Sequence, residues 1–196
     1  MMTTQSSSKE IRVGVVPLGE VPLLIGRVIA DNIYAFFELQ TEILASLPLP
    51  ADALDKSRMQ FDAGQILQVL EKEAFRGYDK IIGVLSADLF VPIFTYVLGE
   101  ARQAGRCALV SIFRLDENVP SGSNNHALML ERCAKVALHE LGHLFDLTHC
   151  SDPNCLMHIS SDALDLDQRR LTLCRYCRSF FRQRLHVHGR GPDTHA

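Results

Sequence analysis

The sequence lacks an apolar run long enough to cross a membrane, which takes about 20 residues in a helix. Its beginning, MMTTQSSSKE, is polar and lacks the apolar segment of a secretory signal. We therefore expect a cytoplasmic protein without a membrane partner, in which residues 1–10 form a disordered tail.

The sequence also lacks internal repeats, low-complexity tracts and a strong excess of charge. Its 196 residues are 47% hydrophobic and 22% charged, and a net charge of −3 makes a nucleic acid an unexpected partner. The length is sufficient for one domain with a full core. None of these features indicates an oligomeric state.

Strands and helices are predicted in alternation. Stretches rich in β-branched and other apolar residues predict strands at 11–18, 80–89 and 108–115. Residues 94–101 fit a strand or a helix, and we favour an edge strand. Apolar residues at helical spacing predict helices at 21–37, 126–147 and 174–185. A further helix is predicted to begin after Asp62, which is a suitable N-cap. Strands interleaved with helices predict an α+β (α/β) fold, in which helices back a mixed sheet.

The stretch HELGHLFDLTHC, residues 139–150, carries the strongest chemical signal. His139 and His143 are four residues apart, so on a helix they lie on one face and can share a metal. Glu140 lies about 100° further round, where it can reach a metal-bound water without being a ligand. This H-E-x-x-H pattern is typical of zinc hydrolases that use the glutamate as general base.

A third histidine, His149, follows six residues after His143. A continuing helix would carry it to the wrong face, so the chain must turn sharply between the two. Three imidazoles can then occupy three corners of a tetrahedron and leave the fourth open for water, as a catalytic zinc requires. H-E-x-x-H alone also occurs by chance in unrelated helices, and the third histidine favours the zinc site.

The predicted helix at 126–147 divides into two faces. The expected core face consists of Leu130, Cys133, Ala134, Ala137, Leu141 and Leu144. The expected cleft face consists of Arg132, Val136, His139 and His143.

Four of the six cysteines form a second candidate metal site. Four residues separate Cys150 from Cys155, and two separate Cys174 from Cys177, which is ligand spacing for a closed four-thiolate zinc. The alternatives are a redox pair at Cys174 and Cys177, or a disulfide under oxidising conditions. Because Cys150 follows His149, a structural zinc would also fix the third histidine. The remaining Cys107 and Cys133 are expected to be buried apolar residues.

Residues 139–177 resemble the archaemetzincins, a branch of the metzincin metallopeptidases. The resemblance rests on the three histidines, the four cysteines and Met157; DLFVP and the surroundings of Arg58, Gln60 and Asp62 match less specifically. It implies a zincin-like metzincin fold, with a mixed twisted sheet packed on helices that include the active-site helix. It also implies that Met157 belongs to the Met-turn, a hydrophobic floor beneath the zinc.

The resemblance further implies a single metzincin-type catalytic domain over residues 11–185, with a tail at 186–196. The expected N-terminal subdomain is 11–146, and the expected zinc-stapled C-terminal subdomain is 147–185. Two zincs per chain are expected, a catalytic one at His139, His143 and His149 and a structural one at the four cysteines. Peptides or proteins are the expected substrates, and trimming of N-termini, as by an aminopeptidase, and internal cleavage both remain open.

One residue departs from the metzincin pattern. Asp146 stands where these proteins usually have a glycine that ends the helix in a left-handed conformation. We predict a positive φ for Asp146, since aspartate visits that region more readily than most residues.

A second interpretation is a catalytically weak or inactive, zinc-stabilised binding protein. It would use the arginine-rich C-terminal segment, with Arg169, Arg170, Arg175, Arg178, Arg182, Arg184 and Arg190 and the aromatic Tyr176, Phe180 and Phe181. A solvated helix face is the simpler interpretation of that segment.

Overall fold

The computed structural model describes residues 10–117 and 125–189. In chain order its strands are β1 (Arg12–Leu18), β2 (Gln40–Ile43), β3 (Leu54–Asp55), β4 (Gln60–Asp62), β5 (Lys80–Leu85), β6 (Leu89–Phe90), β7 (Gly99–Ala101) and β8 (Cys107–Ser111). Its helices are α1 (Leu23–Phe37), α2 (Ala63–Lys72), α3 (Asn125–Leu144), α4 (Ala163–Asp167) and α5 (Arg175–Gly189), with a short 3-10 turn at Ala51–Ala53.

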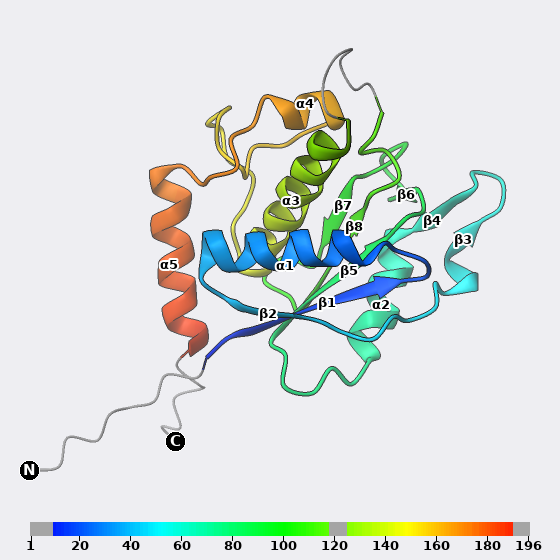
Figure 1. Cartoon of the computed structure of the whole chain (residues 1–196), viewed down its shortest axis with the longest axis horizontal. Coiled ribbons are helices and arrows are strands. Elements are labelled where there is room, and N and C mark those ends of the chain that lie inside the picture. Colours follow the sequence, from blue (N-terminus) through cyan, green and yellow to red (C-terminus); the bar gives the residue numbers. More distant parts are fainter. Residues whose placement is uncertain (1–9, 118–124, 190–196) are drawn as a thin grey trace, which may run out of the picture.

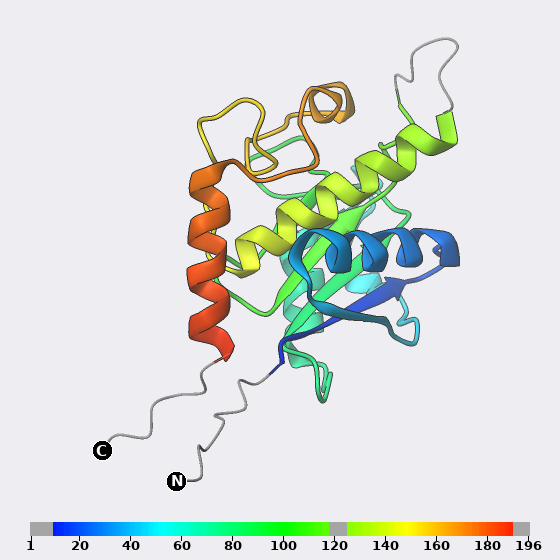
Figure 2. The same ribbon diagram turned by 60° about the vertical axis from the view of Figure 1, so that its left-hand side comes forward.

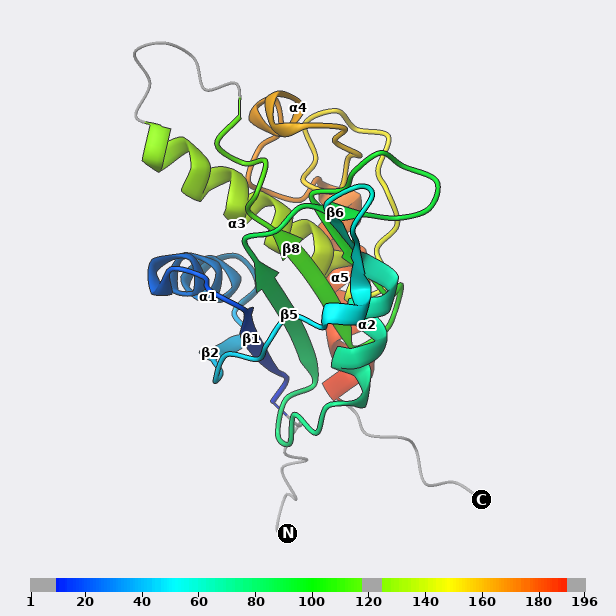
Figure 3. The same cartoon turned by 90° about the vertical axis from the view of Figure 1, so that its right-hand side faces the viewer.

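The main sheet has five strands in the order β2-β1-β5-β8-β7. All neighbours are parallel except β7, which runs antiparallel to β8 and forms one edge. Helices α1 and α3 cover one face and α2 covers the other (Figures 1 and 3). Along β5, Ile82 and Val84 face α1 and α3, whereas Ile81 and Leu85 face α2, because side chains alternate along a strand. The predicted mixed sheet backed by helices is confirmed.

A second, three-stranded sheet, β3-β4-β6, lies beside β7. Asp62, the last residue of β4, caps α2, since its carboxylate accepts a hydrogen bond of 3.1 Å from the Gln65 amide. The predicted N-cap is confirmed. In the turn before β4, Arg58 donates hydrogen bonds to the carbonyls of Phe94 and Thr95, so this small sheet supports the segment that leads to β7.

Several predicted boundaries differ from the structure. The edge strand is restricted to 99–101, because Phe94 enters a turn with Val91 and Val97 donates its amide to Leu89 O instead. The strand predicted over 80–89 ends at Leu85, and α4 lies in a stretch where no helix was expected. Helix α5 continues to Gly189, past the predicted domain end at 185. The predicted tail at 1–10 lies outside the described residues except for residue 10, and the predicted tail at 186–196 was placed too early, because residues 186–189 belong to α5 and only the rest lies outside the described residues.

The prediction that Arg132 faces a cleft is wrong. Its side chain is fully buried and pairs with Asp167 at 2.7 Å, while Nη1 donates to Leu115 O and Glu117 O. A buried guanidinium needs such partners, and α4 supplies the carboxylate. Arg132 therefore ties α4 to α3.

Among the described residues, no helix is long and apolar enough to span a membrane.

Candidate active site

The three histidines of the HELGHLFDLTH stretch come together at the end of α3. The ligand nitrogens of His139, His143 and His149 all lie within 4.8 Å of one another. His139 Nδ1 donates to Leu156 O at 2.8 Å, and His143 Nδ1 donates to Leu147 O at 2.7 Å. Because a carbonyl can only accept, both neutral rings carry their proton on Nδ1 and turn a lone pair of Nε2 inward.

These inward nitrogens fit a metal ion. His139 Nε2 and His143 Nε2 lie only 3.0 Å apart, and two lone pairs cannot satisfy each other. Two nitrogens at about 2.0 Å from one zinc stand about 3.3 Å apart, close to the observed spacing. Burial, and then repulsion from His143, lowers the pKa of His139 to about 3, which keeps this imidazole neutral.

A sharp turn at Asp146 brings His149 to the other two histidines. Asp146 has a φ of 67°, as predicted. Its amide bonds to His143 O at 2.9 Å and the Leu147 amide bonds to Gly142 O at 3.0 Å, which together form a Schellman motif. The Asp146 carboxylate accepts hydrogen bonds from Gln103 and Arg184, and these contacts offset the cost of the left-handed backbone.

The carboxylate of Glu140 lies between α3 and the edge strand. Its side chain is buried beside β7, where a Cβ atom added to Gly99 would lie 2.6 Å from Glu140 Oε1. Only glycine at 99 leaves this room. Burial raises the pKa of Glu140, and the nearby Glu100 carboxylate raises it further.

Met157 is fully buried beneath α3. A Cβ added to Gly142 would lie 2.5 Å from its sulfur, so the glycine of HELGH admits the methionine. The Cys150 amide donates to Met157 O at 2.8 Å, and this bond joins the segment after His149 to the Met157 turn.

A cleft of about 780 Å³ opens over the histidines and Glu140. One wall consists of residues 94–98, which we call the upper rim, followed by β7 and Gln103. The other wall consists of residues 158–162 and, in and after α4, Asp165, Leu166 and Arg169. His158 belongs to the second wall, where its Nδ1 donates to Cys150 O at 2.8 Å. A cleft of this size accommodates several residues of a peptide.

The four cysteines form a separate, closed cluster. The sulfurs of Cys150, Cys155, Cys174 and Cys177 lie within 4.8 Å of one another, and none forms a disulfide. Cys150 Sγ and Cys174 Sγ are 3.8 Å apart, and four thiolates at about 2.3 Å from one zinc would stand about 3.8 Å apart. The Cys174 amide also points at Cys155 Sγ over 3.3 Å. The donor set and its spacing fit a tetrahedral metal. As expected, Cys107 and Cys133 are buried elsewhere.

Helix α5 lies beside the C-terminal end of α3 (Figure 2) and links the cysteine cluster to the turn at Asp146. It begins between Cys174 and Cys177, and its buried Phe181 packs against Phe145, the residue before Asp146, with ring centres 4.9 Å apart. Among the arginines of this helix, Arg184 pairs with Asp146, whereas Arg175, Arg178 and Arg182 line a shallow hollow on the outer face.

Sequence reasoning missed Gly99, Gln103 and Arg184. Their partners lie far away in the sequence, so no local spacing indicates them. Gly142 could have been found, because a glycine inside a helix is unfavourable without a packing reason.

Comparisons with known proteins agree with this geometry. The model for peptidase family M54 matches residues 31–183. An archaemetzincin from Pyrococcus furiosus is 34% identical over 184 residues, which cover 90% of this chain and 94% of the relative. One from Methanopyrus kandleri is 40% identical over 138 residues, 70% of this chain and 74% of the relative. The crystal structure of the Methanopyrus kandleri archaemetzincin superposes with a TM-score of 0.80, at 32% identity, and covers 94% of this chain and 99% of that one.

Proposed function

The chain belongs to peptidase family M54, the archaemetzincins, and is a zinc metallopeptidase; on this premise we propose which of its residues hold zinc and which perform the hydrolysis. His139, His143 and His149 hold the catalytic zinc. The proposal is supported chiefly by the two facing Nε2 atoms 3.0 Å apart, which need a cation between them. Cys150, Cys155, Cys174 and Cys177 hold a second, structural zinc, so that each chain carries two.

Glu140 is the general base of the proposed reaction. A zinc at the three histidines would lower the pKa of a water it binds from about 15.7 to about 7 and would polarise the substrate carbonyl. Glu140 accepts a proton on a carboxylate oxygen and passes it to the leaving amine. The Glu140 side chain packs closely beside Gly99, and its exposure of 7% limits its contact with bulk water.

The free edge of β7 binds the substrate backbone. The Leu98 carbonyl and the Arg102 amide form hydrogen bonds with β8. The backbone amide and carbonyl of Glu100, midway between them, therefore also face β8, whereas those of Gly99 and Ala101 face outward. An extended peptide can add to this edge as a further strand. Because β7 lies beside Glu140, strand addition would bring the scissile bond to the base.

Met157 supports the site from below without binding metal. Its sulfur packs on Gly142, between the turns of α3 that carry His139 and His143. The structural zinc supports the site from the side, because Cys150 directly follows His149.

Elemental analysis of the wild type beside His143→Ala and Cys174→Ser tests both metal assignments. We expect two zincs per chain in the wild type and one lost in each variant. A peptide-library screen then reads N-terminal trimming and internal cleavage separately, with Glu140→Ala as control. A single zinc, lost only in Cys174→Ser, would overturn the catalytic site and favour a binding protein.

A further inference from the structure

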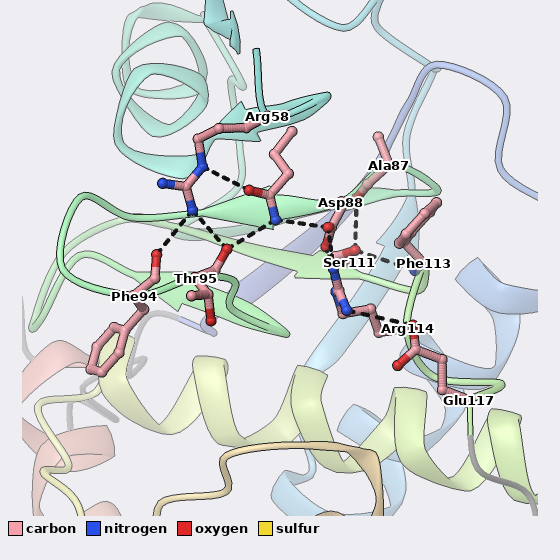
Figure 4. Close-up of polar contacts among 10 residues, drawn as sticks. Arg58, Ala87, Asp88, Phe94, Thr95, Ser111, Phe113, Arg114 and Glu117 are labelled. Carbon is pink, nitrogen blue, oxygen red and sulfur yellow. Dashed lines mark hydrogen bonds and ion pairs between the residues drawn. The ribbon is translucent and has the colours of Figure 1, made fainter. Parts of the chain in front are cut away.

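Four side chains from separate parts of the chain form a hydrogen-bonded series behind the upper rim (Figure 4). Arg58 Nε donates to Gln60 Oε1 at 2.8 Å, and Gln60 Nε2 donates to Asp88 Oδ2 at 2.8 Å. Arg114 holds the same carboxylate with two hydrogen bonds, of 2.8 and 2.6 Å. We call these four residues the rim network. None of them belongs to the histidine or cysteine cluster.

The rim network ends on the backbone of the upper rim. Arg58 Nη2 donates to Thr95 O at 2.8 Å and to Phe94 O at 3.3 Å, and Gln60 Nε2 donates to Thr95 O at 3.0 Å. The guanidinium of Arg114 stacks on Tyr96, 4.1 Å from the ring centre. Three consecutive rim residues are therefore held from the side away from the cleft.

The rest of the upper rim is fixed by backbone hydrogen bonds. The Val97 amide donates to Leu89 O, and Leu98 O accepts from the Ser111 amide, both at 2.9 Å. Residues 94–96 lie outside any strand, and the rim network takes the place of a strand partner for them. It thereby holds three residues of the cleft wall that no strand pairing holds.

The carboxylate at the centre of the network is buried. The Asp88 side chain is 7% exposed and that of Arg114 is 26% exposed. Burial opposes ionisation, but the hydrogen bonds from Arg114 and Gln60 outweigh it and hold the pKa of Asp88 below its usual value. Removing one partner of a buried charge leaves the other uncompensated, so the members of the network depend on one another.

The network presents an apolar side chain to the cleft. Phe94 is 54% exposed, although Arg58 donates hydrogen bonds to its carbonyl and to that of Thr95. The Phe94 ring points away from Arg58 (Figure 4). Ile159, on the opposite wall, is 53% exposed. Exposed apolar side chains on both walls of a cleft are suited to contact with apolar side chains of a ligand.

We propose that Arg58, Gln60, Asp88 and Arg114 are positioning residues for peptide binding, which hold the upper rim and Phe94 in the one conformation that accepts an extended peptide. The proposal rests on the proposed peptidase function and deepens it. It predicts that the network contributes to substrate binding and leaves the bond-breaking step alone, since none of its members reaches the histidines or Glu140.

The test uses zinc-loaded Arg58→Gln, Arg58→Lys and Asp88→Asn. The control is Arg12→Gln, because exposed Arg12, like Arg58, stacks on an aromatic ring (Tyr78 for Arg12 and Phe90 for Arg58) but pairs with Glu42, far from the cleft. Three quantities are measured: KM and kcat for the best peptide of the library screen, affinity of that peptide for the same variants made inactive by Glu140→Gln, and hydrogen exchange of the amides of residues 95–98.

We expect Arg58→Gln to raise KM about tenfold while kcat stays within about twofold, the signature of lost binding that ground state and transition state share. Peptide affinity falls by the same factor and exchange at 95–98 accelerates at least about tenfold, with zinc content unchanged. Arg58→Lys recovers part of the loss because an ammonium can serve one carbonyl. Arg12→Gln changes none of these values.

Unchanged exchange and unchanged affinity in Arg58→Gln and Asp88→Asn would overturn the proposal. So would a loss of kcat at constant KM, or a wild type that binds no peptide. If the wild type binds peptide but cleaves none, the proposed catalysis fails on its own, and exchange and affinity still decide the role of the rim network.

Discussion

The histidine cluster and the cysteine cluster are adjacent in sequence and differ in almost every physical respect. The histidines come mainly from a long buried helix and open onto a cleft, with neutral rings oriented by backbone carbonyls. The cysteines come from loops and from the start of α5, face one another, and receive backbone amides. A packed helix can hold an open site in place, whereas loops such as those of the cysteine cluster would gain their order from the zinc that we propose they bind.

The comparison predicts that the closed cluster matters most for folding. Cys174→Ser should release one zinc and lower stability more than any substitution in the histidine cluster or on the surface, because structural zinc contributes about 10–16 kcal/mol in small zinc domains. Thermal unfolding followed by circular dichroism, with elemental analysis, measures both effects. Cys107→Ala, which removes a buried thiol outside the cluster, should keep full zinc. An unchanged melting temperature in Cys174→Ser would contradict the view that the cysteine cluster stabilises the fold.

At the histidine cluster, by contrast, a substitution should change catalysis without changing stability. Glu140→Gln should lower kcat by about 10²–10⁴-fold, the usual contribution of general acid–base catalysis, while both zincs and the melting temperature are retained. Steady-state kinetics on the best library peptide measure this, and Glu73→Gln, which changes an exposed glutamate at the end of α2, serves as the control. Loss of zinc in Glu140→Gln would mean that the glutamate is a ligand.

Gly99→Ala tests the position of the Glu140 carboxylate from the opposite wall of the cleft. The added methyl group would meet Glu140 Oε1 at 2.6 Å, so the carboxylate must move while the histidines stay in place. We expect kcat to fall by about tenfold or more with zinc content unchanged, since a misplacement of about 1 Å costs on the order of 10²-fold. Full activity in Gly99→Ala would show that the base tolerates displacement.

Asp146 lies in the turn between His143 and His149, and its substitution should have an intermediate effect. Asp146→Ala keeps the positive φ of 67° but loses the contacts to Gln103 and Arg184. We expect a loss of about 1–2 kcal/mol in the free energy of unfolding, and Asp146→Gly should recover most of it because glycine removes the backbone cost. Denaturant unfolding measures both. Equal stability of Ala and Gly variants would rule out backbone strain as the cause.

The outer face of α5 should matter least. The double change Arg178→Gln with Arg182→Gln should alter stability by no more than about 0.5 kcal/mol and leave zinc content unchanged, as expected for a solvated surface. Binding of the wild type to a labelled oligonucleotide at low salt, lost in this variant, would instead support the binding-protein interpretation.

The sequence was most informative where chemistry requires a fixed local spacing. The spacing of four positions from His139 to His143 places both on one helix face, and the two-residue gap between Cys174 and Cys177 lets both sulfurs bind one metal, so both clusters could be recognised. The turn at Asp146 could be predicted too, because His149 had to return to the site.

What escaped prediction depends on residues far apart in sequence. Asp146 pairs with Arg184, 38 positions away, and Asp88 joins Gln60 to Arg114 across 28 and 26 positions. The edge strand was predicted too long for the same reason, since residues 94–96 are held by the side chains of Arg58, Gln60 and Arg114 and not by strand pairing. The burial of Arg132 was missed because its partner, Asp167, comes from a helix of five residues with little apolar pattern.

Gly99 also provides a criterion for interpreting related sequences. In the proposed assignment, metal binding needs only the three histidines, whereas Glu140 as the base also needs an empty space on the neighbouring strand. A relative that keeps every histidine but carries a side chain at the position of Gly99 would be expected to load zinc and yet be a poor peptidase. The residue that distinguishes an active enzyme from a metal-binding relative would then lie outside the signature by which such enzymes are recognised.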